Sequence, residues 1–98
     1  MTAEELWQIR EETSFIFLDV REMHEVEALP YANLNNVVHI PMGSVGEHLD
    51  DLDKSKNIIV GCKSGGRSAA VCDYLSDQGY QTYNLTGGIL AWSNLQQN

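Results

Sequence analysis

The sequence predicts an α/β fold in which a parallel sheet of four or five strands is flanked by helices on both faces. Helix-like and strand-like segments alternate along almost the whole chain. The main strand-like segments are continuous apolar runs, which is typical of parallel strands buried on both faces. No internal repeat, low-complexity tract or linker-like stretch interrupts the 98 residues, so we expect residues 1–98 to form a single domain.

The first half of the chain contains two predicted helices and two predicted strands. Thr2 and Glu5 have capping-box spacing, and Leu6 and Ile9 then form one apolar face, which predicts a short first helix. An apolar run predicts a strand at 15–20, and a second one predicts a short strand at 37–40. Between them we expect a short helix at 23–29 that stops near Pro30.

The second half repeats the alternation. Ser44 and Glu47 again have capping-box spacing and predict a helix that ends near Leu52. The remaining elements are a strand at 57–61, a helix at 68–78 closed by Gly79, a strand at 80–85 and a last helix at 88–95. Ligand sites of such sheets lie beyond the carboxyl ends of the strands, and Cys62 lies one residue past one of these ends.

The composition excludes several classes of partner. The formal charge of −8 repels nucleic-acid phosphates and anionic membrane surfaces, so we expect neither nucleic acid nor membrane as a partner. No apolar run approaches the ~20 residues that span a bilayer. The N-terminus is acidic, unlike the basic start of a secretory signal, and we therefore expect a soluble, cytoplasmic protein.

The cysteines and histidines predict neither a disulfide scaffold nor a metal site. Two cysteines are too few for such a scaffold and lack the paired spacing of a zinc site, so free thiols in a reducing compartment are expected. Cys72 lies in the middle of a predicted helix and is expected to be a core residue. The histidines are scattered without ligand spacing, at His24, His39 and His48.

Charge is unevenly distributed along the chain. The window from Lys54 to Cys72 contains four basic residues and no acidic one, whereas the rest contains all fourteen acids and only two arginines. The basic residues of this window are Lys54, Lys56, Lys63 and Arg67. A local cationic segment in an acidic chain favours the approach of a small anion.

The segment IIVGCKSGGRSAAV, residues 58–71, combines an apolar strand, a cysteine, a glycine loop and the start of a helix. Such a loop directs several backbone N–H groups into one concavity, and the partial positive charge of the helix N-terminus adds to them. This field favours the thiolate of Cys62 and lowers the pKa of its thiol. Gly65 and Gly66 permit backbone angles that let the loop fold around the sulfur. We therefore predict that Cys62 is a nucleophile.

The same residues also have plainer interpretations. A cysteine at a strand end is commonly a small buried hydrophobe, which is the alternative for Cys62. Arg67 either contacts an anion or braces the loop against an acid such as Asp19 or Glu22. Lys63 either steers an anionic substrate or is simply solvated.

Four segments resemble the rhodanese-like sulfurtransferase domains, in the order and at the intervals expected of that family. They are LDVRE at 18–22, IP at 40–41 followed by a short helix, CKSGGRS at 62–68 and YNLTGGILAW at 83–92. The resemblance covers nearly the whole chain. It implies the rhodanese-like α/β fold, in agreement with the alternation of elements.

The resemblance also implies transfer of a sulfane sulfur through a persulfide on Cys62. A small anionic donor such as thiosulfate would supply the sulfur, and cyanide, a thiol or a sulfur-carrier protein would accept it. The chemistry requires no metal or organic cofactor. The residues implied to form the loop that binds substrate and persulfide are Lys63, Ser64, Gly65, Gly66, Arg67 and Ser68. Asp19 and Arg21 are candidates for supporting this loop.

Two other functions remain open at this point. The cell-cycle dual-specificity phosphatases share the general fold and a loop cysteine, but they place one more residue between that cysteine and the arginine. Here four residues, 63–66, intervene, and the shorter loop favours one sulfur atom over a tetrahedral phosphate. Phosphatase or arsenate-reductase chemistry is therefore the weaker alternative. The other is a binding module that recognises a partner without turnover.

Overall fold

A computed structural model describes residues 1–96 and contains one four-stranded sheet, in the order β2-β1-β3-β4. All three strand pairs are parallel. The fold class predicted from the sequence is therefore confirmed, with four strands among the described residues. The strands are β1 (Phe15–Asp19), β2 (Val37–His39), β3 (Asn57–Gly61) and β4 (Thr82–Asn84).

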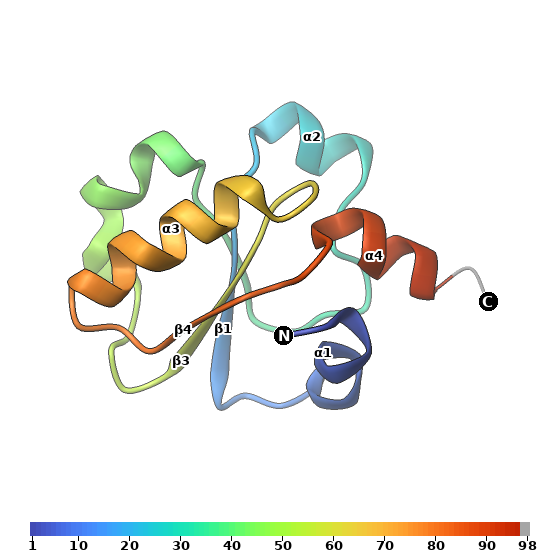
Figure 1. Ribbon diagram of the computed structural model, residues 1–98, viewed down its shortest axis with the longest axis horizontal. Helices are drawn as coiled ribbons and strands as arrows, with labels where there is room; N and C mark the ends of the chain where they lie inside the picture. Colours follow the sequence, from blue (N-terminus) through green and yellow to red (C-terminus); the bar gives the residue numbers. More distant parts are fainter. Residues whose placement is uncertain (97–98) are drawn as a thin grey trace.

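Helices cover both faces of the sheet (Figure 1). The 3₁₀ helix η1 and the long helix α3 lie on one face, and α1 and α4 lie together on the other. Helix α2 lies at the edge of the sheet where β1 ends. The bounds are α1 (Ala3–Ile9), α2 (Met23–Ala28), η1 (Met42–Asp51), α3 (Gly66–Asp77) and α4 (Gly88–Leu95).

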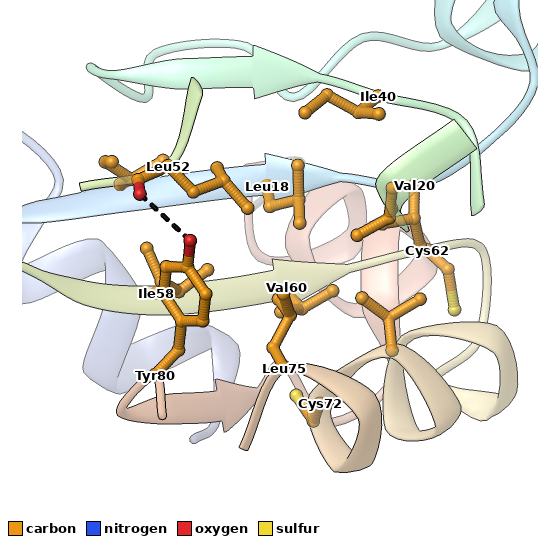
Figure 2. Packing of buried hydrophobic residues seen from close by; sticks show 13 residues of the cluster. Leu18, Val20, Ile40, Leu52, Ile58, Val60, Cys62, Cys72, Leu75 and Tyr80 are labelled. Carbon is orange, nitrogen blue, oxygen red and sulfur yellow. Dashed lines mark hydrogen bonds between the residues drawn. The ribbon is translucent and has the colours of Figure 1, made fainter. Parts of the chain in front are cut away.

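The sheet separates two hydrophobic clusters. Every residue of β1 is buried. Its apolar side chains alternate between the two clusters, so that Leu18 belongs to one and Phe17 to the other, and Asp19 is buried in an ion pair with Arg21. This two-sided burial explains why the strand is a continuous apolar run rather than an alternating one. Figure 2 shows the cluster between the sheet and α3, which contains Leu18, Val60 and Leu75. Cys72 packs in the same cluster, so the core position predicted for it is confirmed.

The helix boundaries differ from the sequence prediction at two places. Helix η1 begins at Met42 directly after Pro41, and the predicted cap at Ser44 is wrong. The backbone N–H of Ser44 instead donates to the Pro41 carbonyl at 2.8 Å, which starts a tight 3₁₀ turn. Helix α3 begins at Gly66, two residues earlier than predicted, because Gly65 with φ +118° makes the turn into the helix.

The outer strands are shorter than predicted, whereas the first helix is as expected. Strand β4 spans Thr82–Asn84 rather than 80–85, because the backbone N–H of Tyr80 still bonds to the end of α3, at the Leu75 carbonyl. The capping box between Thr2 and Glu5 is present. No helix formed by residues 1–96 is long and apolar enough to cross a membrane.

Candidate active site

Cys62 follows the last residue of β3 and is almost completely buried, with 1% of its surface exposed. Its Sγ accepts a hydrogen bond from the backbone N–H of Gly65 at 3.1 Å and from that of Ser68 at 3.4 Å. The Ser68 hydroxyl lies 3.3 Å from the same sulfur. The sulfur therefore lies beside the loop into α3 (Figure 2), where the N–H groups and the helix N-terminus favour a negative charge.

The two cysteines differ in the effect of their surroundings on the thiol. Burial is the largest single influence on Cys62 and favours the neutral thiol, but hydrogen bonds from Ser68, Gly65 and Ser64 together outweigh it. The pKa of the Cys62 thiol consequently lies below its ordinary value. Burial raises the pKa of the Cys72 thiol, and its contact with Thr82 offsets this only in part. Of the two, Cys62 is the one suited to nucleophilic chemistry.

Helix α4 forms two hydrogen bonds with the backbone of the cysteine loop. The backbone N–H groups of Ile89 and Leu90 donate to the carbonyls of Cys62 and Lys63, at 2.9 and 3.3 Å. These two bonds connect the first two residues of the loop, Cys62 and Lys63, to α4. Gly88 makes this contact close: a Cβ on it would lie 2.6 Å from the Lys63 carbonyl oxygen, and its φ of +55° is unfavourable for other residues.

Arg67 pairs with Glu25 of α2 through two parallel hydrogen bonds. They join Nη1 to Oε1 at 2.7 Å and Nη2 to Oε2 at 2.8 Å. The sequence left open an anion contact or a brace to Asp19 or Glu22. The acid partners suggested for the brace were wrong, because Asp19 is occupied by Arg21 and Glu25 lies opposite Arg67.

We expect the contribution of this ion pair to stability to depend on pH. The bonds from Arg67 and from the Glu22 backbone lower the pKa of Glu25 from 4.5 to about 2. Because the folded pKa is the lower one, the contribution is complete well above pH 4.5 and is lost as the pH falls through about 2. Urea unfolding of Glu25→Gln should show a loss of about 0.5–1 kcal/mol at neutral pH, since the pair is partly exposed. This loss should shrink with acidification.

Glu27→Gln is the matched control, since Glu27 lies on the same helix and is exposed. It should change the free energy of unfolding by less than about 0.5 kcal/mol at every pH. A loss in Glu25→Gln that stayed constant down to pH 2 would contradict the assignment of the ion pair.

Asp19 and Arg21 form a buried ion pair at the carboxyl end of β1. The guanidinium donates to Asp19 Oδ1 at 3.0 Å and to Oδ2 at 2.8 Å, and also to the Leu29 carbonyl at 2.8 Å. It also lies over the ring of Tyr31, 4.9 Å from the ring centroid. The Tyr31 hydroxyl in turn donates to the Cys62 carbonyl at 2.7 Å. Tyr31 thus connects the ion pair to the backbone of the cysteine loop.

Three residues of the site were not identified from the sequence: Glu25, the partner of Arg67, together with Tyr31 and Asn84. Tyr31 follows Pro30 in a loop, and nothing in its local pattern indicates a contact with Cys62. Asn84 is the last residue of β4, and its side chain bonds to Gly65 and Ser68. A signal for Asn84 did exist: a polar residue at the end of a parallel strand lies at the same sheet edge as Cys62.

The outer part of the loop is exposed. Lys63 and Ser64 lie at its surface, and Lys63 lines a shallow cavity together with Leu29 and Leu90. Residues 1–96 contain no group of three or more His, Cys, Asp and Glu side chains arranged to hold a metal ion.

Comparison with known proteins identifies the same family that the sequence motifs resemble. The family model of the rhodanese-like domain matches residues 2–95. The Bacillus subtilis protein YtwF is 40% identical over 85 residues, which cover 87% of this chain and 80% of that protein. The thiosulfate sulfurtransferase GlpE of Coxiella burnetii is 29% identical over 89 residues, covering 90% and 80% of the two chains.

A solved structure agrees with these relatives. The crystal structure of a rhodanese-like domain protein from Staphylococcus aureus superposes with a TM-score of 0.84 at 30% identity, covering 94% of this chain and 88% of that one. The family match, the sequence relatives and the shared fold lead to one conclusion: the chain belongs to the rhodanese-like domain family, whose members of similar size include sulfurtransferases.

Proposed function

We propose that this protein is a sulfurtransferase that carries a sulfane sulfur as a persulfide on Cys62. The observation that carries the proposal is the position of Cys62 Sγ, which receives backbone hydrogen bonds from Gly65 and Ser68 at the N-terminus of α3. These donors are fixed before any substrate arrives, and they favour an anionic sulfur in a site with little water. The resting thiolate and the persulfide are both anions and benefit from the same surroundings.

The proposed reaction has two displacement steps. The Cys62 thiolate attacks the outer sulfur of thiosulfate, a new S–S bond forms, and the old S–S bond breaks with its electron pair leaving on sulfite. The negative charge is then on the terminal sulfur, and we propose that the backbone N–H groups of residues 63–67 bind it. Cyanide, a thiolate or a sulfur-carrier protein attacks this terminal sulfur, and the Cys62 thiolate leaves. Electrons balance in both steps without a redox cofactor.

Phosphatase chemistry is the less favoured candidate for two reasons. Four residues separate Cys62 from Arg67, which leaves a small loop. The guanidinium of Arg67 is also held by both oxygens of Glu25, so the group that would bind a phosphate is already paired.

Mass spectrometry after incubation with thiosulfate tests the proposal directly. The peptide containing Cys62 should gain the mass of one sulfur atom, and cyanide should remove it with release of thiocyanate. The peptide containing Cys72 serves as an internal control and should not change. If the folded protein acquires no sulfur on Cys62 from thiosulfate or any other sulfane donor, the proposal is wrong. An aryl phosphate hydrolysed at Cys62 would support the phosphatase instead.

Lys63 is expected to steer the anionic donor toward Cys62, because it is an exposed cation beside the sulfur in an otherwise acidic chain. Lys63→Glu should lower kcat/KM for thiosulfate by about tenfold at low ionic strength. The loss should shrink as salt is added, since ions screen charges at the surface. Steady-state kinetics at several salt concentrations measure both effects.

The control for this variant is Lys56→Glu, which changes the net charge equally. Lys56 lies before β3, at the opposite end of that strand from Cys62. It should alter kcat/KM by less than about twofold. Equal losses in the two variants would mean that the total charge matters and that the position of Lys63 does not.

The remaining parts of the proposal concern the sulfur donor, the acceptor and the cellular location of the protein. We propose a small anionic sulfane donor and a thiol or sulfur-carrier protein as acceptor. Two free cysteines, both buried, are compatible with a reducing compartment, and we propose the cytoplasm.

A further inference from the structure

The side-chain amide of Asn84 has a fixed orientation. Its Nδ2 donates to the Gly65 carbonyl at 3.2 Å. A carbonyl oxygen can only accept, so the amide nitrogen has to face it. The amide oxygen of Asn84 consequently points at the Ser68 hydroxyl, with which it forms a short hydrogen bond. An amide oxygen is also only an acceptor, so Ser68 has to be the donor in this contact.

Ser68 has one hydroxyl proton and three acceptors within reach. They are the Asn84 amide oxygen, the Gly65 carbonyl at 3.2 Å and Cys62 Sγ at 3.3 Å. The Gly65 carbonyl already receives the N–H groups of Ala69 and Asn84. The contact with Asn84 is the shortest of the three. The proton therefore lies between Ser68 and Asn84, and a lone pair of Ser68 faces the sulfur.

The backbone N–H groups of Gly65 and Ser68 favour the Cys62 thiolate, but a Ser68 hydroxyl that donates to Asn84 favours the neutral thiol instead. The S–H group can donate to the Ser68 oxygen, completing the chain from Cys62 through Ser68 to Asn84. A thiolate has no proton, so a lone pair would face a negative sulfur. The Ser68 hydroxyl then has to turn toward Cys62, which leaves the Asn84 amide oxygen without its donor.

We propose that Asn84 is a positioning residue that limits the thiolate content of Cys62 by competing with the sulfur for the single proton of Ser68. The inference rests on the proposed function, because it assigns a role to Asn84 in preparing the nucleophile. When solvent water takes the thiol proton, the Ser68 hydroxyl turns from Asn84 to the sulfur. When the persulfide forms, the charge moves one atom outward, and the hydroxyl returns to Asn84.

Other charged groups near Cys62 remain the same in all variants of the test. They are Lys63 in the loop, Arg67 paired with Glu25, and the Asp19 and Arg21 pair at the end of β1; the neutral Tyr31 hydroxyl, which donates to the Cys62 carbonyl, is also unchanged. Differences between variants of Asn84 therefore report on Asn84 and its two partners.

The experiment measures the rate at which iodoacetamide alkylates Cys62 in the full chain across pH, without any sulfur donor. Asn84→Ala removes the competing acceptor, so at a fixed pH below the thiol pKa alkylation should be roughly tenfold faster, the value of one hydrogen bond to a charged group. Asn84→Asp keeps the size of the side chain but strengthens the acceptor and adds negative charge, so alkylation should be slower than in the wild type. A residue that merely supported the fold, or acted only through its charge, would change the two rates equally with and without the Ser68 hydroxyl.

Ser68→Ala supplies the decisive control. In this background Asn84→Ala should change the alkylation rate by less than about twofold, because no hydroxyl proton remains to be shared. An unchanged or slower rate in Asn84→Ala overturns the proposal. The same acceleration with and without the Ser68 hydroxyl also overturns it, since Asn84 would then act through Gly65 alone.

Failure of Asn84→Ala to fold and absence of a persulfide in the wild type also have defined consequences for the proposal. If Asn84→Ala does not fold, Asn84→Asp is compared with and without the Ser68 hydroxyl, and a slowing of the same size in both backgrounds overturns the proposal. If wild-type protein never forms a persulfide, the proposed function fails, while the alkylation rates still test the role of Asn84. The two failures are therefore distinguishable.

Discussion

Replacing Cys62 with serine is expected to abolish sulfur transfer, with a loss of at least about a thousandfold in kcat. A serine hydroxyl is not ionised by the donors that surround the sulfur, and oxygen cannot form the persulfide. The fold should be retained, because serine is nearly the same size and the backbone N–H groups of Gly65 and Ser68 can bond to its oxygen. Thiocyanate formation from thiosulfate and cyanide is the measurement.

Cys72→Ala is the control for this variant. Cys72 packs in the cluster between the sheet and α3, and burial raises the pKa of its thiol, so it takes no part in the proposed reaction. The variant should lose stability through a small cavity, by roughly 1 kcal/mol, and keep its activity. Substantial transfer by Cys62→Ser would contradict the proposed mechanism. Unchanged cellular function in that variant would favour a binding module.

The elements that could be predicted from the sequence are those whose burial leaves a direct pattern. β1 and β3 are buried on both faces, so the apolar runs at 15–20 and 57–61 located them to within a residue. β4 is partly exposed and only three residues long, and its limits are set by contacts with β3 and α3. The pattern of Ser44 and Glu47 matched a capping box, but Pro41 and the packing of Val45 place the helix start at Met42.

The residues of the candidate site also fall into two groups, those that the local sequence could predict and those that it could not. The cysteine loop is local: a strand end, two glycines and a helix start lie within a few residues, so their arrangement around Cys62 could be predicted. The partners of the loop come from distant segments. Glu25 reaches Arg67 from α2, and Asn84 reaches Ser68 from β4. A single sequence contains no record of which distant residues meet. The acids predicted to pair with Arg67, Asp19 and Glu22, were therefore the wrong ones.

The buried pair of Asp19 and Arg21 is expected to be the most sensitive point for stability. Asp19→Ala should lower the free energy of unfolding by about 3–5 kcal/mol, because it leaves the Arg21 guanidinium buried without its counter-charge. That is a large part of the roughly 5–15 kcal/mol that stabilises a typical domain. Urea unfolding at neutral pH measures the loss. The variant should also weaken sulfur transfer, since Arg21 contacts Tyr31, which holds the Cys62 carbonyl.

A double-mutant cycle separates the stranded charge from lost packing. Asp19→Ala combined with Arg21→Met removes both charges and keeps most of the apolar volume of the arginine stem, which packs beside Tyr31. If the cost of Asp19→Ala comes from the unpaired guanidinium, the double variant should be more stable than the sum of the two single losses, by at least about 1 kcal/mol. Additive losses, or a cost below about 1 kcal/mol for Asp19→Ala alone, would mean that the guanidinium is sufficiently paired by the Leu29 carbonyl. The support of the cysteine loop would then have to come from α4, through the bonds that Ile89 and Leu90 donate to its carbonyls.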